Sequence, residues 1–111
     1  MDERAWERDA DSPSWYGVRC VFRHRGLCVY EERVTLWTAR SADEAIGRAE
    51  AEAVEYCEAL DEVGYAGFAE AFRIDGAPGE GAEVFSLMRE SGLPPGEYVQ
   101  RFFATGDERT G

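Results

Sequence analysis

Lysine and asparagine are absent from this sequence of 111 residues, and histidine occurs once. The basic side chains are therefore all arginines, 12 against 23 acidic side chains, and the formal net charge is −11. A charge of this sign repels the phosphates of nucleic acids and of anionic membranes, so we expect neither as a partner. The abundance of alanine, glycine, glutamate and arginine is typical of a GC-rich bacterial genome.

Cysteine is scarce and long apolar runs are missing. No apolar run approaches the roughly 20 residues that a membrane-spanning helix needs. The three cysteines are an odd number, and Met1 to Arg4 carry no apolar stretch of a secretion signal. We therefore expect a cytoplasmic protein whose thiols are reduced and serve as small core residues. The hydrophobic share of 44% is ample for the core of one globular domain.

The ordered domain is expected to occupy residues 15–105. Residues 1–14 are charged and end in a Ser-Pro-Ser sequence, which is typical of a flexible N-terminal arm. Residues 106–111 are expected to form a C-terminal tail. The chain is thus predicted to be a single domain with short flanking segments.

A β-hairpin is predicted at the start of the domain. Between residues 16 and 24 apolar side chains occupy the even positions, which is the period of a half-buried strand. Arg25-Gly26 marks a turn, and residues 28–39 are rich in the β-branched and aromatic side chains of a return strand. A three-residue loop would pair even positions with even ones and place Phe22 opposite Tyr30.

A long helix and further strands follow the hairpin. Ser41 and Glu44 form a capping box, after which apolar residues and alanines recur at helical spacing. Residues 65–75 and 82–89 predict two more strands, and residues 97–103 predict a short helix. The expected architecture is ββαββα, a four-stranded antiparallel sheet of order 2-1-3-4 in the α+β class, with one long helix on one face and a short C-terminal helix.

Both faces of the predicted sheet carry apolar side chains, and one long helix can cover only one of them. We expect the C-terminal segment to cover the second face. A homodimer that uses Trp15 or Trp37 is a further way to cover it. The apolar residues of the covering segment are Tyr98, Val99, Phe102 and Phe103.

Several short stretches of the chain are similar to a known family. They are Trp15–Arg19, Tyr30–Val34, Ser41–Ala45, Val84–Arg89, Leu93–Pro95, and Phe102-Phe103 followed by Thr105–Arg109. On these stretches the chain resembles the bacterial domain of unknown function family 4288, over residues 15 to about 109. The resemblance implies a small α+β domain and assigns no catalytic residue.

The few cysteines and the single histidine do not predict a metal site. Cys20, His24 and Cys28 could share one face of the hairpin. However, Cys20 and His24 lie about 13 Å apart along a strand at roughly 3.3 Å per residue, whereas zinc ligands lie roughly 2.0–2.3 Å from the ion. The glycine-rich stretch 76–81 has no basic residue to hold a phosphate. Nothing in the sequence indicates that the single histidine lies close to a serine or cysteine and could act as its catalytic base. We therefore expect neither metal nor cofactor.

Glu32 and Glu70 alternate with apolar residues along the second and third predicted strands. A carboxylate on a core face must find a partner or shift its pKa upward, and a raised pKa is what a general acid needs. The simpler interpretation, which we favour, is an ion pair with an arginine such as Arg19 or Arg73, or a bulge that turns the carboxylate outward. These four residues form a candidate ligand pocket.

The acidic outer face of the long helix is the remaining feature. Such faces are usually only solvated, because runs of charge serve solubility. The alternative is a docking surface for a basic protein. The residues expected at this contact are Glu50, Glu55, Glu58 and Glu62, with Trp15 and Trp37 from the sheet.

The sequence therefore predicts a non-enzymatic protein-interaction module, of an immunity or accessory type, with a protein as its partner. The interpretation from another class is a small enzyme or ligand-binding domain that uses Glu32 and Glu70. We favour the interaction module because each catalytic motif considered is missing or has a simpler structural explanation.

Overall fold

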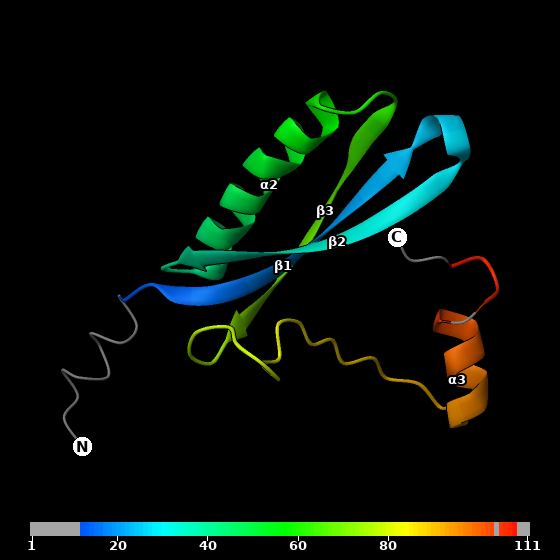
Figure 1. The fold of residues 1–111 in the computed structure, drawn as a ribbon. Helices are drawn as coiled ribbons and strands as arrows, with labels where there is room; N and C mark the ends of the chain where they lie inside the picture. The colour runs from blue at the N-terminus through cyan, green and yellow to red at the C-terminus, as the bar shows by residue number, and fades with distance from the viewer. Residues whose placement is uncertain (1–11, 104, 109–111) are drawn as a thin grey trace, which may run out of the picture.

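The structure, a computed structural model, describes residues 12–103 and 105–108. Its elements are β1 (Ser14–His24), the 3-10 turn η1 (Arg25–Leu27), β2 (Val29–Ala39), α2 (Ala42–Glu58), β3 (Val63–Ile74) and α3 (Pro95–Phe102). The strands form one antiparallel sheet of order β2-β1-β3, and α2 packs on one face of it (Figure 1). This confirms the α+β class. Residues 1–11 of the predicted arm and 109–111 of the predicted tail lie outside the described residues.

The β1–β2 hairpin pairs one residue away from the predicted register. Four residues join the strands, and the last of them, Cys28, has a left-handed backbone with a φ of 53°. Phe22 consequently lies opposite Glu31 rather than Tyr30. Because side chains alternate along a strand, the slip turns the odd-numbered side chains of β2 toward α2 and the even-numbered ones to the other face.

The core lies between β1 and α2. It is built from Tyr16, Val18, Cys20 and Phe22 on β1 and from Ala45, Ala49 and Ala53 on α2. The three alanines are almost fully buried, as their small side chains allow the helix axis to approach the sheet closely. Phe22 is the largest fully buried side chain, and its ring lies 5.0 Å from that of Tyr56 and 5.6 Å from that of Tyr65, between centroids.

The start of α2 confirms the predicted N-cap. The hydroxyl oxygen of Ser41 accepts a hydrogen bond from the Glu44 amide at 3.1 Å. Ser41→Ala leaves that amide without its partner, so we expect the free energy of unfolding to fall by about 1 kcal/mol. Urea denaturation measures the change, and Ser41→Thr, which keeps the hydroxyl, is the matched control. Equal midpoints for Ser41→Ala and the parent protein would show that the cap does not stabilise the helix.

The two edges of the sheet differ. Between the pairs Cys20–Ala69 and Phe22–Tyr65, residues 66–68 of β3 lie opposite a single residue of β1, which is a β-bulge. Gly67 in this bulge has a φ of 82°, a conformation that glycine adopts without steric cost. β2 pairs with β1 along its whole length without such an interruption.

The second face of the sheet, opposite α2, is crossed by an extended segment instead of a fourth strand. Residues 82–89, predicted as that strand, pair with no described strand, so the sheet has three strands rather than four. The segment passes directly over Gly17 on β1, and a Cβ at this position would overlap the carbonyl oxygen of Val84. Glycine is therefore required at position 17, because the carbonyl occupies the place of a side chain.

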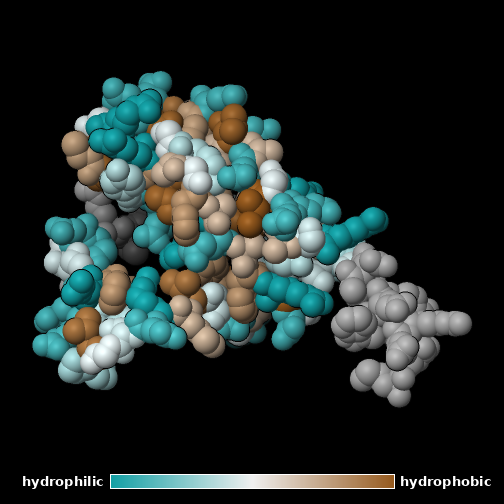
Figure 2. Space-filling view, turned by 180° about the vertical axis from the view of Figure 1, so that it is seen from behind, coloured by the Kyte–Doolittle hydropathy of each residue, from teal (hydrophilic) through white to brown (hydrophobic). Residues whose placement is uncertain are grey.

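Helix α3, expected to cover the second face, forms at the predicted place in the chain but lies at the margin of that face (Figure 1). It makes no extensive contact with any strand or with α2. Seen from behind, α3 stands off at the lower left, separated by a gap from a body whose middle shows apolar atoms (Figure 2). On the second face, Tyr30, Val34 and Leu36 of β2 are 63%, 44% and 40% exposed.

Candidate functional site

Arg19 joins two glutamates on the second face of the sheet. It lies on the central strand β1, directly opposite Glu70 on β3, and Glu32 reaches it from β2. One Nη atom of Arg19 donates to Glu32 at 3.1 Å, and the other donates to Glu70. The prediction that these acids pair with an arginine such as Arg19 is confirmed. Both carboxylates accept from the same guanidinium, while the Glu32 side chain stays 61% exposed.

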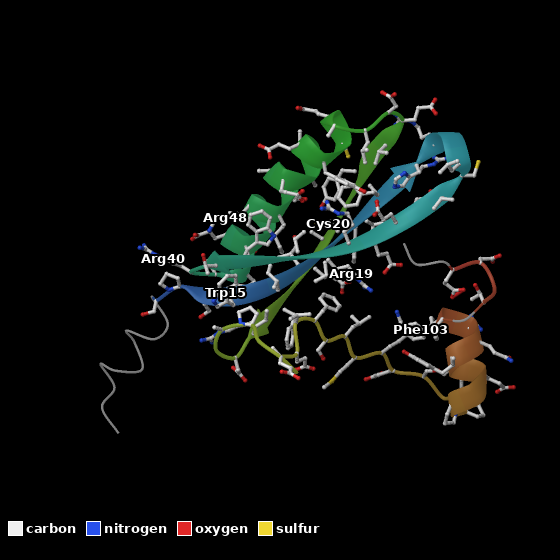
Figure 3. All side chains as sticks on the ribbon, in the orientation of Figure 1. Trp15, Arg19, Cys20, Arg40, Arg48 and Phe103 are labelled. Atoms are coloured by element: carbon white, nitrogen blue, oxygen red, sulfur yellow. The ribbon has the colours of Figure 1, made fainter. Side chains whose placement is uncertain are left out.

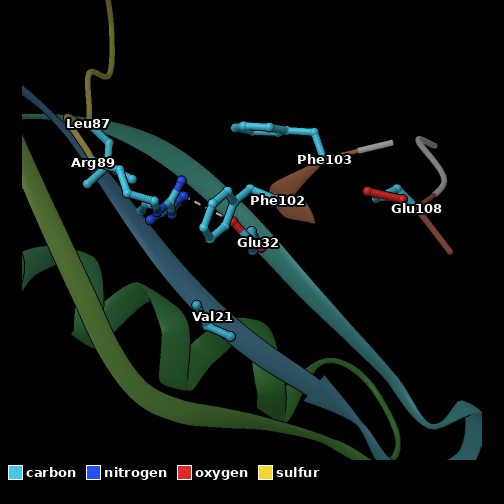
Figure 4. Close-up of a pocket in the computed structure, with 8 residues that line it drawn as sticks. Val21, Glu32, Leu87, Arg89, Phe102, Phe103 and Glu108 are labelled. Atoms are coloured by element: carbon cyan, nitrogen blue, oxygen red, sulfur yellow. Dashed lines mark hydrogen bonds and ion pairs between the residues drawn. The ribbon is translucent and has the colours of Figure 1, made fainter. Parts of the chain in front are cut away.

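A hollow of about 490 Å³ opens beside this Glu32–Arg19–Glu70 bridge (Figure 4). The sheet supplies Arg19, Val21 and Glu32 to its wall, and the C-terminal third of the chain supplies Leu87, Arg89, Phe102, Phe103 and Glu108. The guanidinium of Arg89 lies 4.2 Å from the centroid of the Phe102 ring, a cation–π contact, and donates to the Tyr98 hydroxyl at 2.9 Å. The hollow thus combines two guanidinium groups with two carboxylates and an aromatic side.

Arg73, grouped with these residues from the sequence, lies elsewhere. It pairs with Tyr16, so its side chain belongs to the face that carries α2, whereas Glu70 lies on the second face. Together with Trp15 and Asp75 it lines a smaller hollow of about 160 Å³. The predicted pocket of four residues is therefore a bridge of three residues and a separate arginine.

The acidic residues of α2 do not all face outward. The hydroxyl of Tyr65 donates to Glu50 at 2.6 Å, so this glutamate is turned toward the sheet. Burial and then this hydrogen bond raise the pKa of the Tyr65 hydroxyl. Glu55, Glu58 and Glu62 are exposed. Of the four acidic residues predicted on the outer face, Glu55 and Glu58 are exposed on α2, Glu50 is turned toward the sheet, and Glu62 lies beyond α2 in the turn before β3.

The two tryptophans expected at a contact have different surroundings. Trp37 packs against the core on the side of α2, where its indole nitrogen donates to the Thr35 hydroxyl at 2.6 Å and Arg48 lies over its ring. Trp15 stands at the start of β1, on the other side of the sheet from Arg48 (Figure 3). Both side chains are only half-exposed. Neither forms one surface with the acidic face of α2.

A polar cluster that the sequence did not predict lies at the hairpin end of the sheet. Glu31 accepts hydrogen bonds from the Tyr56 hydroxyl at 2.7 Å and from the His24 imidazole at 2.9 Å. Arg33 lies over the Tyr56 ring, 3.7 Å from its centroid. The slip in hairpin register explains why this cluster was missed, since it moves Glu31 to the side of α2.

The Glu31 cluster makes stability depend on pH. Burial acts to raise the pKa of Glu31, but the hydrogen bonds from His24 and Tyr56 outweigh it and hold the pKa below its ordinary value of 4.5. Because the folded pKa is the lower one, the stability that Glu31 contributes is present above about pH 4.5 and is lost as the pH falls through the folded pKa. Glu31→Gln should therefore lose less stability than the parent protein on acidification.

Urea denaturation at a series of pH values measures this difference. Glu55→Gln, which removes an exposed carboxylate of α2, is the control and should follow the parent protein. Parallel loss of stability in the parent protein and in Glu31→Gln would contradict a role for the cluster.

The cysteines and the remaining titratable groups give no metal-ligand arrangement. Within the described ranges, no three histidine, cysteine, aspartate or glutamate side chains gather as metal ligands do. Cys20 is buried and Cys57 half-buried, but Cys28 is exposed in the hairpin turn, which corrects the expectation of three core thiols. No helix of the described part of the chain has the length and apolar character needed to cross a membrane.

Comparison with protein-family models, with curated proteins and with solved structures gave no match. The resemblance to the domain of unknown function family 4288 therefore stays a prediction. The interpretation of the fold and of the candidate sites depends on the residues of this chain alone.

Proposed function

We propose that the protein is a non-enzymatic protein-interaction module whose partner is a basic protein. The observation that carries the proposal is a surface at the C-terminal end of α2 that combines apolar and acidic side chains. Val54 and Leu60 are 51% and 41% exposed there, beside the exposed Glu55 and Glu58. Exposed apolar groups rimmed by charge are typical of protein contacts.

The charge of this surface is not explained by stability of the helix. The C-terminal end of a helix carries a partial negative charge, which favours basic side chains in the last turn. In α2 the last turn has no basic residue and contains Glu55 and Glu58, neither of which forms an ion pair in the part of the chain described. The surface therefore holds uncompensated negative charge beside apolar anchors, which matches a basic partner.

The test is capture of a partner by the tagged protein, followed by measurement of its affinity at increasing salt. Reversing charge with Glu55→Arg and Glu58→Arg should abolish the contact, and salt should weaken it in the parent protein. The matched control reverses two exposed acids outside α2, Glu83→Arg and Glu90→Arg, which changes the net charge equally. An equal loss of affinity in the α2 double variant and in the control double variant would indicate general electrostatic attraction. Unchanged affinity in the α2 double variant would refute this contact.

Ligand binding at the hollow beside Arg19 is the second candidate. In its favour, Arg19 and Arg89 bring two guanidinium groups to the wall of one hollow. A small dicarboxylate such as succinate is the appropriate probe, since Arg89 also lines the hollow. A succinate-dependent shift of the Arg19 Nε–H NMR signal that Arg89→Ala removes would support this function, and an unchanged spectrum would exclude succinate as a ligand.

A further inference from the structure

The outer edge of β2 carries no partner strand among the described residues. β2 is an edge strand of 11 residues that pairs with β1 on one side, and no described segment pairs with its other side. It contains no proline and no bulge. An edge of this kind presents a row of unpaired backbone donors and acceptors, which is a template for another strand.

One side-chain contact indicates which backbone groups point to this edge. Arg48 donates to the carbonyl oxygen of Thr38, which is therefore turned away from β1. Since backbone groups of alternate residues point to opposite neighbours, the even positions of β2 present their N–H and C=O groups to the open edge. The same even positions place the exposed side chains of Tyr30, Val34 and Leu36 on the second face. Free backbone groups and exposed apolar side chains thus coincide.

We propose that two copies of the chain associate through antiparallel pairing of their β2 strands, around a two-fold axis at Val34. Val34 is the midpoint of Val29–Ala39, so this register pairs every residue of the strand. Glu32 then faces Leu36 of the second copy. The two three-stranded sheets join into one, with both α2 helices on the same face.

Charge disfavours the registers shifted toward the hairpin turn, and full pairing of Val29–Ala39 disfavours a shift the other way. An axis at Arg33 or at Glu32 would place identical charges directly opposite each other, which is destabilising. With the axis at Val34, Arg33 faces Thr35 and meets its own copy only on the diagonal. Each Arg33 is already paired with Glu52 of its own chain at 3.1 Å, which offsets that approach.

The second copy also contributes to the hollow beside Arg19. Glu32 lines this hollow, and the proposed register sets Leu36 of the second copy opposite Glu32. Tyr30, Val34 and Leu36 of both copies become direct or diagonal neighbours across the axis, so apolar side chains that are exposed in one chain cover each other. The hollow gains an apolar wall that a single chain does not provide.

Sedimentation velocity of the full chain over a wide range of concentrations tests the association. We expect a dimer in the parent protein and a monomer in Val34→Lys, with the fold retained by circular dichroism. Phe68→Lys is the matched control, because Phe68 is 48% exposed on the opposite edge of the sheet, and it should leave the dimer intact. A monomeric parent protein, or equal dimerisation of both variants, would overturn the proposal.

Chemical cross-linking tests the register independently of charge. In a Cys28→Ser background, Val34→Cys should be joined to its own copy by a short thiol-specific reagent, because directly opposed Cβ atoms lie about 5 Å apart. Phe68→Cys is the control and should give no such product. Cross-linking at position 68 rather than 34 would place the contact at the other edge and refute the β2 register.

Salt separates this proposal from the basic partner. Each copy carries a formal net charge of −11, so screening should strengthen the dimer, whereas it should weaken binding of a basic protein at α2. Dimerisation without partner capture would contradict only the proposed function. Capture by a monomeric protein would contradict only the β2 pairing.

Discussion

Phe22→Ala is expected to lower the free energy of unfolding by about 3–5 kcal/mol, because it removes the largest buried side chain and leaves a cavity. Phe22 is 1% exposed, and the rings of Tyr56 and Tyr65 pack against it. Domains of this size are commonly stable by about 5–15 kcal/mol, so the variant should be close to unfolding. Urea denaturation followed by tryptophan fluorescence measures the change.

The control for this prediction is Phe68→Ala on β3. Phe68 is 48% exposed, so its removal creates no closed cavity, and the expected change is about 0.5 kcal/mol or less. Similar losses in both variants would show that the core does not centre on Phe22. A small loss at Phe22 alone would mean that α2 can collapse onto the space the ring leaves.

Gly17→Ala is expected to displace the extended segment from the second face of the sheet. The added Cβ would overlap the carbonyl oxygen of Val84, and this is a backbone atom that cannot rotate away as the end of a side chain can. To relieve this overlap, residues 82–89 must move away from β1. That movement also separates the Phe85 ring from the Arg19 guanidinium, which lies 4.9 Å from the ring centroid in the parent protein. Hydrogen exchange and protease cleavage within residues 82–89 should rise.

Gly47→Ala is the matched control for Gly17→Ala. A Cβ at position 47 has no other atom within 4 Å, and the glycine stands exposed in α2. Alanine there should stabilise the protein by roughly 0.5–1 kcal/mol, since glycine weakens a helix interior. Unchanged exchange at Val84 and Phe85 in Gly17→Ala would contradict the docking of the segment.

The parts of the fold that depend on local sequence could be predicted. The Ser41 cap and the helical spacing of the alanines depend on residues within a few turns of each other, and the structure confirms both. The order of the first three strands followed from the right-handed crossover of the second strand over the first, and it too is confirmed. In each case the deciding interaction joins residues that are close in sequence, or it is imposed by general chain geometry.

The errors arose where a distant residue or a single turn conformation decides. One left-handed residue, Cys28, lengthens the hairpin loop and reverses the faces of β2. Residues 82–89 have the composition of a strand, but they cross the sheet because Gly17 on another strand offers space for a backbone carbonyl. Neither effect can be predicted from the sequence pattern of the segment that it changes.

Only the ion pairing of the candidate site could be predicted from the sequence. A charged group on a sheet face requires a counter-ion, and this rule alone led from Glu32 and Glu70 to Arg19. Arg73 could have been excluded, since an odd position of the strand cannot share the face of Glu70. The aromatic wall at Phe102 and Phe103 depends on where α3 comes to rest, which no local pattern specifies.

The bulge in β3 limits how far such sheets can grow. A chain with two regular edges could add neighbours on both sides and polymerise into a filament, whereas the left-handed Gly67 interrupts the ladder on one side. Only the β2 edge offers regular pairing, and an assembly that uses one edge per chain is complete at two chains. Straightening the bulge by deleting residues 66 and 67 should therefore convert the proposed dimer into an assembly prone to open-ended, fibrous growth.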